Sequence, residues 1–189
     1  MTRVINIVGR GMGSEDAPRE NCWGVNIVML RRPVDVGFDM HEEGKMNDIQ
    51  MQRRREIIPW VTAQNIPVYA VDAIPGTTYI RYPMEEVVGK FRTGYFSNAI
   101  CYMIALALLE GVDQLNFYGV VHLRTHKEYA AQKPAVDYWI GRAEQMGVGV
   151  YIHGDYSEIG RTEDGLAYGY KLTAEELVKK YGNSNWHHP

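Results

Sequence analysis

The sequence predicts an α/β protein, with a mostly parallel sheet of about six strands and helices on both faces. Short runs rich in β-branched residues alternate along the chain with segments of helical periodicity, an order typical of βαβ units. The first of these runs, residues 3–8, leads directly into a glycine-rich loop, Gly9-Arg-Gly-Met-Gly13. Such a turn can bring backbone amides close to an anion, because no Cβ stands between the main chain and a phosphate.

The strands are expected where β-branched and aromatic residues form short runs bounded by turn residues. These runs cover residues 4–8, 23–29, 36–40, 68–71, 115–120 and 148–152. The turn 14–20 has no room for a full crossover helix, so the pairing of the first two strands stays open. The segment 72–83 contains the turn signal Pro75-Gly76 and is expected to be a loop close to a ligand.

The helices are expected where apolar residues recur at helical spacing, over residues 45–64, 84–91, 98–110, 128–146 and 174–181. The helix 98–110 is apolar almost all round, which predicts a central, buried element. Thr173 and Glu176 have the spacing of a capping box at the start of the last helix. Gly111, Gly147 and Gly182 each follow a helix, where a left-handed residue commonly ends one.

The length suits one domain, because 189 residues of which 46% are hydrophobic can bury roughly 70% of the unfolded surface. We expect a single nucleotide-binding domain over residues 1–182, followed by a tail over residues 183–189. Trp60, Trp139 and Trp186 are candidates for a contact between subunits, so a homo-oligomer is one alternative for the assembly.

The net charge of −3 gives no attraction toward bare nucleic acid or anionic lipid, so neither is an expected partner. The run Arg53-Arg54-Arg55 could form a local phosphate patch. The alternative is a solvated helix face, which we favour because Ile57 and Val61 supply the buried side of the same helix.

The two cysteines, Cys22 and Cys101, lie far apart in apolar surroundings, which predicts buried free thiols in a reducing compartment. The longest apolar run, residues 99–109, is shorter than the roughly 20 residues that a membrane span needs. No signal peptide is recognised at the N-terminus. We therefore expect a cytoplasmic protein without a membrane partner.

Backbone and side chains at the first two strand ends predict a site for a nucleotide. Gly9, Gly11, Gly13 and Ser14 would hold a phosphate, although a plain strand-exit turn explains the same glycines. Asn26 near the end of the second strand could bind a ribose hydroxyl, a base edge or a phosphate, or it could satisfy the backbone.

Titratable residues follow the third strand. Asp39 and His41 alternate onto the same face, so the carboxylate can orient the imidazole as a general base. A loop histidine satisfied by a capping aspartate is the alternative. Ser97 and Asn98 precede the apolar helix, where either side chain can cap it and its free amides can face an anion.

The strand 115–120 leads through Gly119 into a polar loop, at the edge where open α/β sheets bind ligands. This loop carries His122, Arg124, His126 and Glu128, which could contact phosphate or move a proton, and solvent exposure alone also explains them.

A metal has weaker support in the sequence. His122 and His126 are four residues apart and His187 adjoins His188, but three ligands at a familiar spacing are missing. A Mg²⁺ ion brought by phosphates and held by Asp39 or Glu128 stays an open alternative.

These stretches together resemble a family of small Rossmann-like proteins often encoded by phages and prophages, which is similar to MptE-like diphosphokinases and bacterial sialyltransferases. The resemblance covers residues 3 to about 155. It implies a doubly wound sheet, with a nucleotide held by the glycine loop, Asn26 and the helix start at Ser97-Asn98. The sialyltransferase relatives use a histidine base without a metal, whereas the diphosphokinase relatives use ATP and Mg²⁺. Those relatives usually carry Gly-Pro-Ser after the first strand, and an acidic residue where this chain has Val121.

The sequence thus leads us to expect a nucleotide-dependent transferase. Glycosyl transfer from a nucleotide-sugar is slightly preferred over pyrophosphoryl transfer from ATP, and His41 or His126 would accept the proton of the acceptor. The alternative is a non-catalytic phage-type protein that binds or sequesters a nucleotide or a host factor.

Overall fold

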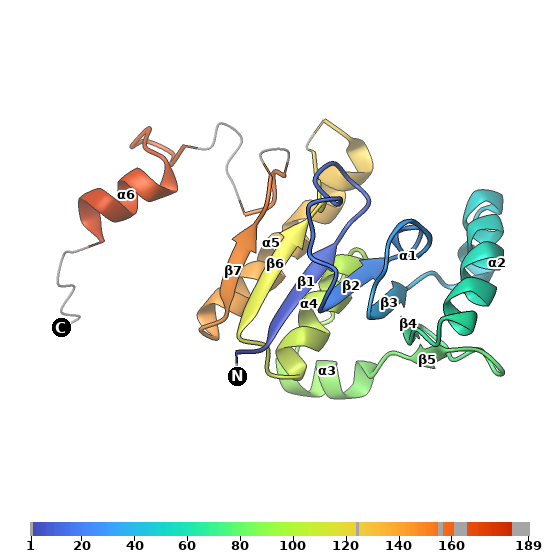
Figure 1. Ribbon diagram of the computed structural model, residues 1–189. Helices are drawn as coiled ribbons and strands as arrows, with labels where there is room; N and C mark the ends of the chain where they lie inside the picture. Colours follow the sequence, from blue (N-terminus) through green and yellow to red (C-terminus); the bar gives the residue numbers. More distant parts are fainter. Residues whose placement is uncertain (1, 124, 155–156, 161–165, 183–189) are drawn as a thin grey trace. The chain divides into compact units, whose positions relative to one another are not determined.

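The computed structural model describes residues 2–123, 125–154, 157–160 and 166–182. Within these residues, seven parallel strands form one sheet in the order β5-β4-β3-β2-β1-β6-β7 (Figure 1). The α/β class is confirmed, with one strand more than the sequence predicts. The chain divides into two compact units, residues 1–159, which contain the sheet, and residues 160–189.

The strands correct the prediction at two places. Their bounds are β1 (Val4–Val8), β2 (Cys22–Val25), β3 (Val36–Asp39), β4 (Val68–Ala70), β5 (Tyr79–Arg81), β6 (Gln114–Tyr118) and β7 (Gly149–Ile152). The second strand ends at Val25 and not at residue 29, because Asn26 adopts a φ of 46° and the one-turn helix α1 (Val28–Arg31) follows. Strand β5 lies within the segment predicted as a loop, where its three residues pair with β4 at the edge of the sheet.

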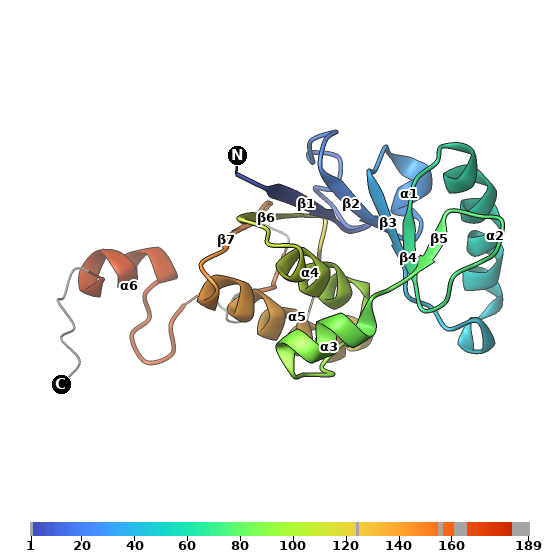
Figure 2. The same ribbon diagram turned by 90° about the horizontal axis from the view of Figure 1, so that it is seen from below.

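The helices agree with the predicted segments to within a few residues at their ends. They are α2 (Asp48–Ala63), α3 (Met84–Phe91), α4 (Ala99–Leu109), α5 (Lys127–Gln145) and α6 (Ala174–Tyr181), with a 3₁₀ turn η1 (Glu43–Lys45) before α2. Figure 2 shows α3, α4 and α5 on one side of the sheet and α1 and α2 on the other. No helix among the described residues is both long and apolar enough to cross a bilayer.

Helix α4 is the centre of the core, as its uniformly apolar sequence predicts. Eight of its eleven residues are buried, and it packs on β1, β2 and β3. Both thiols are buried and free, Cys101 within this helix and Cys22 in β2.

Trp139 of α5 is fully buried, so the expectation that it contacts another subunit is wrong. Its ring lies 5.3 Å from Phe91 and 5.1 Å from Phe96 between centroids, and its indole N–H donates to the Tyr95 carbonyl at 2.8 Å. Trp60 is 47% exposed, and Trp186 lies outside the described residues.

The connection from β1 to β2 contains no helix, and side chains satisfy its backbone instead. The guanidinium of Arg32 donates to the carbonyls of Ser14, Ala17 and Pro18. Asn6 of β1 donates through Nδ2 to the Glu20 carbonyl at 2.8 Å. These bonds hold the thirteen-residue stretch 9–21 against the sheet where most parallel connections use a helix.

The glycine loop packs directly on the residues that follow β6. The Gly9 amide donates to the Tyr118 carbonyl and the Gly11 amide to the Gly119 carbonyl, both at 2.8 Å. A Cβ on Gly9 would lie 2.4 Å from the Gly119 carbonyl oxygen, and Gly119 itself has a φ of +60°. Glycine is required here because two backbones touch.

The second unit begins its helix as predicted. Thr173 and Glu176 form the capping box of α6.

Two of the three glycines expected to end helices are left-handed. Gly111 and Gly147 have the conformation that the sequence predicts, with φ of +74° and +81°. Gly182 has a φ of −67°, so the left-handed cap expected there is wrong, because the residue continues in the right-handed conformation.

The contact between the two backbones predicts the effect of a methyl group. Gly9→Ala should lower the free energy of unfolding by about 1–3 kcal/mol, because the Gly119 backbone must move to admit a Cβ. Gly141→Ala is the matched control, since Gly141 lies exposed in α5 and no atom lies within 4 Å of the added Cβ. That control should raise the free energy of unfolding by about 0.5–1 kcal/mol. Urea unfolding measures both, and equal effects of the two changes would contradict the close approach.

Candidate functional site

A cleft of about 720 Å³ opens at the carboxyl ends of the strands. The chain leaves β1 toward β2 on one side, whereas β6 lies on the other side of β1, so the winding reverses between β1 and β6. Such a reversal is the usual ligand site in open α/β sheets, because loops that leave two adjacent strands diverge there. The loops after β1, β2, β3 and β6, helix α2 and the first turns of α4 and α5 form the walls.

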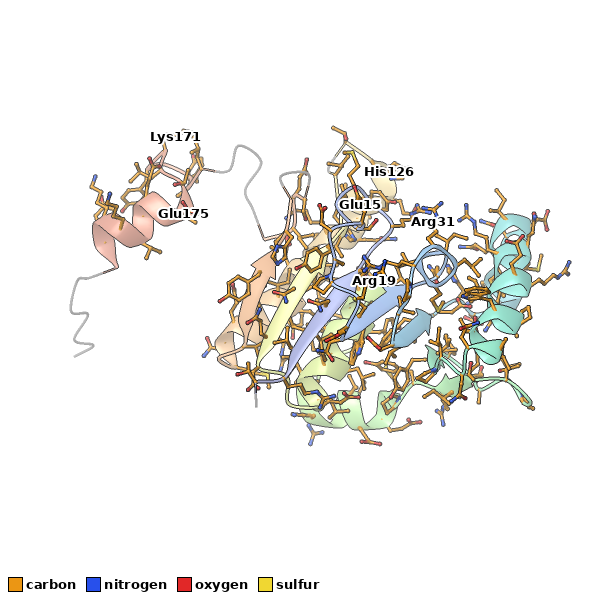
Figure 3. All side chains as sticks on the ribbon, viewed as in Figure 1. Glu15, Arg19, Arg31, His126, Lys171 and Glu175 are labelled. Atoms are coloured by element: carbon orange, nitrogen blue, oxygen red, sulfur yellow. The ribbon has the colours of Figure 1, made fainter. Side chains whose placement is uncertain are left out.

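The structure brings most of the predicted site residues to this cleft. The predicted site residues that line the cleft are Gly9, Gly11, Asn26, Asp39, His41, Ser97, Asn98 and Gly119, together with His122 of the polar loop and Glu128 of α5. Gly13, Ser14 and His126 are not among the lining residues. His126 is exposed (Figure 3). Its ring is tilted by 34° against that of Tyr129, with 4.5 Å between the centroids. Arg124, His187 and His188 lie outside the described residues.

The amides of the glycine loop differ from the expectation. Those of Gly9 and Gly11 are occupied by the carbonyls that follow β6, and the Ser14 amide donates to the Gly11 carbonyl at 3.3 Å. The predicted phosphate cradle is therefore not formed by these amides, because they hold two loops together. The loop shapes the cleft through its close packing.

The most connected group in the cleft is the buried carboxylate of Asp39. Its Oδ1 lies 2.8 Å from His41 Nδ1, which confirms the predicted pairing of the two side chains. Its Oδ2 lies 3.1 Å from Arg54 Nε and accepts a hydrogen bond from the Tyr79 hydroxyl at 3.3 Å. Burial and the nearby carboxylate raise the pKa of Tyr79, so this phenol stays a neutral donor. Since Asp39 engages Nδ1, the Nε2 atom of His41 is the nitrogen left for a ligand.

Two of the three arginines in the basic run of α2 line the cleft, which corrects their assignment to a solvated face, whereas Arg55 is exposed as expected. Arg53 and Arg54 line the wall beside Gln50 and Ile57, and the Arg54 side chain is only 12% exposed. The four positions follow the i, i+3, i+4, i+7 spacing of one helix face. This spacing is the sequence pattern that indicates the position of the arginines, because it places them on the same helix face as the buried Ile57.

At the opposite wall, Asn98 joins the start of α4 to a buried histidine. Its Oδ1 accepts from the Cys101 amide at 3.3 Å, and its Nδ2 donates to His122 Nε2 at 2.9 Å. Because Nε2 accepts, the ring proton lies on Nδ1. That atom is buried and has no hydrogen-bond partner among the described residues.

His122 is 5% exposed, and burial lowers its pKa to about 4. The imidazole is therefore neutral near pH 7, and its Nδ1–H is a buried donor without a partner among the described residues. Ala99 and Ile100 line the same wall, and the amides in the first turn of a helix have no acceptor within it. The helix dipole adds partial positive charge, so this wall favours a negatively charged ligand group.

Arg10 and Tyr129 form a further part of the rim that the sequence did not single out. Arg10 donates through Nη2 to the Tyr129 hydroxyl at 2.8 Å, which joins the glycine loop to α5. Below them, the Ser97 hydroxyl donates to the Gln132 carbonyl at 2.9 Å. Ser97 is thus a structural link between α4 and α5, and Arg10 places a positive charge at the cleft.

The donor groups of the cleft fit a metal poorly. Both oxygens of Asp39 are engaged by His41, Arg54 and Tyr79. Glu128 is exposed, and its Oε1 accepts from Gln132 Nε2 at 3.1 Å. Across the described residues, three or more His, Cys, Asp or Glu side chains do not gather as metal ligands.

The buried histidine predicts a dependence of stability on pH. Between about pH 6.5 and 4 the unfolded chain protonates His122 and the folded chain does not, so stability falls as the pH falls, by at most about 1.4 kcal/mol per pH unit. Urea unfolding at about pH 7 and about pH 5 should therefore show a smaller loss for His122→Gln than for the wild type.

The exposed His153 provides the matched control, and His153→Gln should keep the wild-type loss. If His122→Gln loses as much stability as the wild type, folding does not lower the pKa of His122.

No protein-family model, curated protein or solved structure matches this chain.

Proposed function

We propose that the protein is a nucleotide-dependent transferase, and that it moves a glycosyl group from a nucleotide-sugar to an acceptor hydroxyl. One observation carries the proposal. The carboxylate-bound imidazole of His41 lines the same cleft as Arg10, Arg53 and the first turn of α4. A proton acceptor and groups suited to phosphate therefore share one cleft at the point where the sheet reverses its winding.

The charges of the cleft support a phosphate-bearing ligand. Arg54 is neutralised by Asp39. Among the described residues, Arg10 is bonded only to the Tyr129 hydroxyl and Arg53 has no ion pair. Two guanidinium groups are thus left for phosphate oxygens, which they can bind in a bidentate manner. The first turn of α4 offers backbone donors for the same negative charge or for a neighbouring hydroxyl.

The Asp39–His41 pair supports the proton transfer. In the proposed reaction, the acceptor oxygen bonds to the anomeric carbon while the bond from that carbon to the nucleotide phosphate breaks. The hydroxyl proton moves to His41 Nε2, and the electron pair of the broken bond stays on the departing nucleotide. Asp39 stabilises the resulting imidazolium, and the guanidinium groups stabilise the negative charge of the leaving phosphate.

Glycosyl transfer is favoured over pyrophosphoryl transfer because of the carboxylates. Pyrophosphoryl transfer from ATP in the diphosphokinases that the sequence resembles uses Mg²⁺, whereas both oxygens of Asp39 are already engaged by His41, Arg54 and Tyr79. The sialyltransferases in the same resemblance use a histidine base without a metal, which agrees with the groups assembled here.

Val121 favours an alternative, a protein that binds a nucleotide without changing it. The residue lines the cleft where relatives usually carry an acidic side chain, and it packs beside Gly11. A hydrophobic side chain there removes one candidate for recognition or catalysis. Such a protein would sequester its nucleotide or present it to another molecule.

A panel of nucleotides and nucleotide-sugars at millimolar concentration should contain one that raises the melting temperature. Incubation of that nucleotide-sugar with simple acceptors should then consume it. His41→Gln should lower kcat roughly 10²–10⁴-fold with the melting-temperature shift retained, because the base is lost and the phosphate groups remain. Arg53→Ala should reduce the shift itself. His153→Gln, exposed and outside the cleft, is the matched control for His41→Gln.

The two candidate functions separate in the same experiment. A bound nucleotide that is recovered unchanged after denaturation, with any acceptor tested, would establish binding without turnover. Absence of a shift across the panel would contradict both functions.

A further inference from the structure

A second hollow, of about 430 Å³, lies on the other side of the glycine loop from the cleft. The stretch 9–21 and α1 with the residues after it form its walls. Four of the residues that line it are arginines: Arg10, Arg19, Arg31 and Arg32. Figure 3 labels Arg19 and Arg31 with Glu15, which is the acidic residue of the lining. The proposed function makes no use of this hollow.

Within the part of the chain that the structure describes, no ion pair engages the four arginines of this hollow. Arg32 is held by three backbone carbonyls, which are neutral, and Arg10 by a tyrosine hydroxyl. Arg19 and Arg31 are exposed and form no ion pair with a described residue. The described lining itself thus carries four guanidinium groups and one carboxylate, in a chain whose net charge is −3.

The arginines are also partly fixed in place. The three carbonyl bonds hold the Arg32 guanidinium, and the Tyr129 hydroxyl holds that of Arg10. Fixed guanidinium groups lose less freedom on binding than free ones, and their planar geometry suits phosphate oxygens. Two of the four arginines of the hollow are thus held in place, and the other two are exposed beside them.

We propose that this hollow is a binding site for the phosphate group of a small molecule, separate from the cleft. Arg10 lines both spaces, so a phosphate here would lie one loop away from the proposed nucleotide. Binding of a phosphate here does not require that the protein be a transferase.

A small molecule fits the lining better than a nucleic acid does. Single-stranded nucleic acid is commonly held by aromatic side chains on which bases stack, and the hollow has no aromatic residue in its described lining. The apolar part of the lining consists of three small side chains, Ala17, Val28 and Pro33. The overall negative charge further disfavours a long polyanion.

Isothermal titration of the full chain with inorganic pyrophosphate at physiological ionic strength tests the site. The double variant Arg19→Glu/Arg31→Glu should weaken the binding by about tenfold or more, because two charged donors are lost. Arg53→Glu, which alters the cleft alone, should leave the affinity of the hollow unchanged. Arg55→Glu, exposed on α2 and lining neither space, is the matched control for added negative charge.

Several results would overturn the site. The wild type could fail to bind pyrophosphate, the double variant could bind as the wild type does, or Arg55→Glu could weaken binding equally, which would show general attraction. A single-stranded oligonucleotide that binds more tightly than pyrophosphate and depends on the same arginines would replace the small molecule with nucleic acid. Arg19→Gln/Arg31→Gln should give the same loss if the glutamate variant unfolds. The nucleotide panel with Arg53→Ala tests the cleft independently.

Discussion

The contact between two strand exits is the constraint on which the cleft depends. After β1 and after β6, the chain runs backbone against backbone, with the amides of Gly9 and Gly11 bonded to the carbonyls of Tyr118 and Gly119. This contact fixes where the two loops part, and the loops form two walls of the cleft. The glycines are therefore needed for the site even though their amides do not face a ligand, since any side chain would push the loops apart.

A second link joins the edge of the sheet to the chemistry of the cleft. Asp39 at the end of β3 contacts Arg54 of α2 and Tyr79 of β5, so one buried carboxylate ties three elements together. The same carboxylate orients His41. Stability and proton transfer therefore depend on one group, and a substitution of Asp39 would alter the packing of the sheet edge as well as the imidazole. His41 is for that reason the cleaner position at which to test the chemistry.

The sequence predicted the α/β class, six of the strands and the general position of the site, because periodicity and strand-end polarity are local signals. It also predicted the pairing of Asp39 with His41, since alternation along one strand places both on the same face. Strand β5 was missed because three edge residues beside Pro75-Gly76 give too little pattern. Two features of the site depend on contacts between distant segments and cannot be predicted from local patterns. The loop amides bond to carbonyls more than 100 residues away, and buried His122 contacts Asn98, 24 residues before it. Arg54 was assigned to solvent because its buried partner comes from another element.

Two buried side-chain amides on β1 and β6 determine how these strands align. Asn6 and Asn116 are directly opposite each other on β1 and β6, both buried, with Asn116 Nδ2 donating to Asn6 Oδ1 at 2.9 Å. If β1 slipped by one residue, Asn6 would turn toward the apolar helix α4 and its amide would lose every partner. The pair thus specifies the register of β1 against β6. A misaligned register would bury an unpaired amide, and that costs more free energy than the hydrogen bond contributes in the native register. The native register of β1 and β6 in turn sets where both strands end.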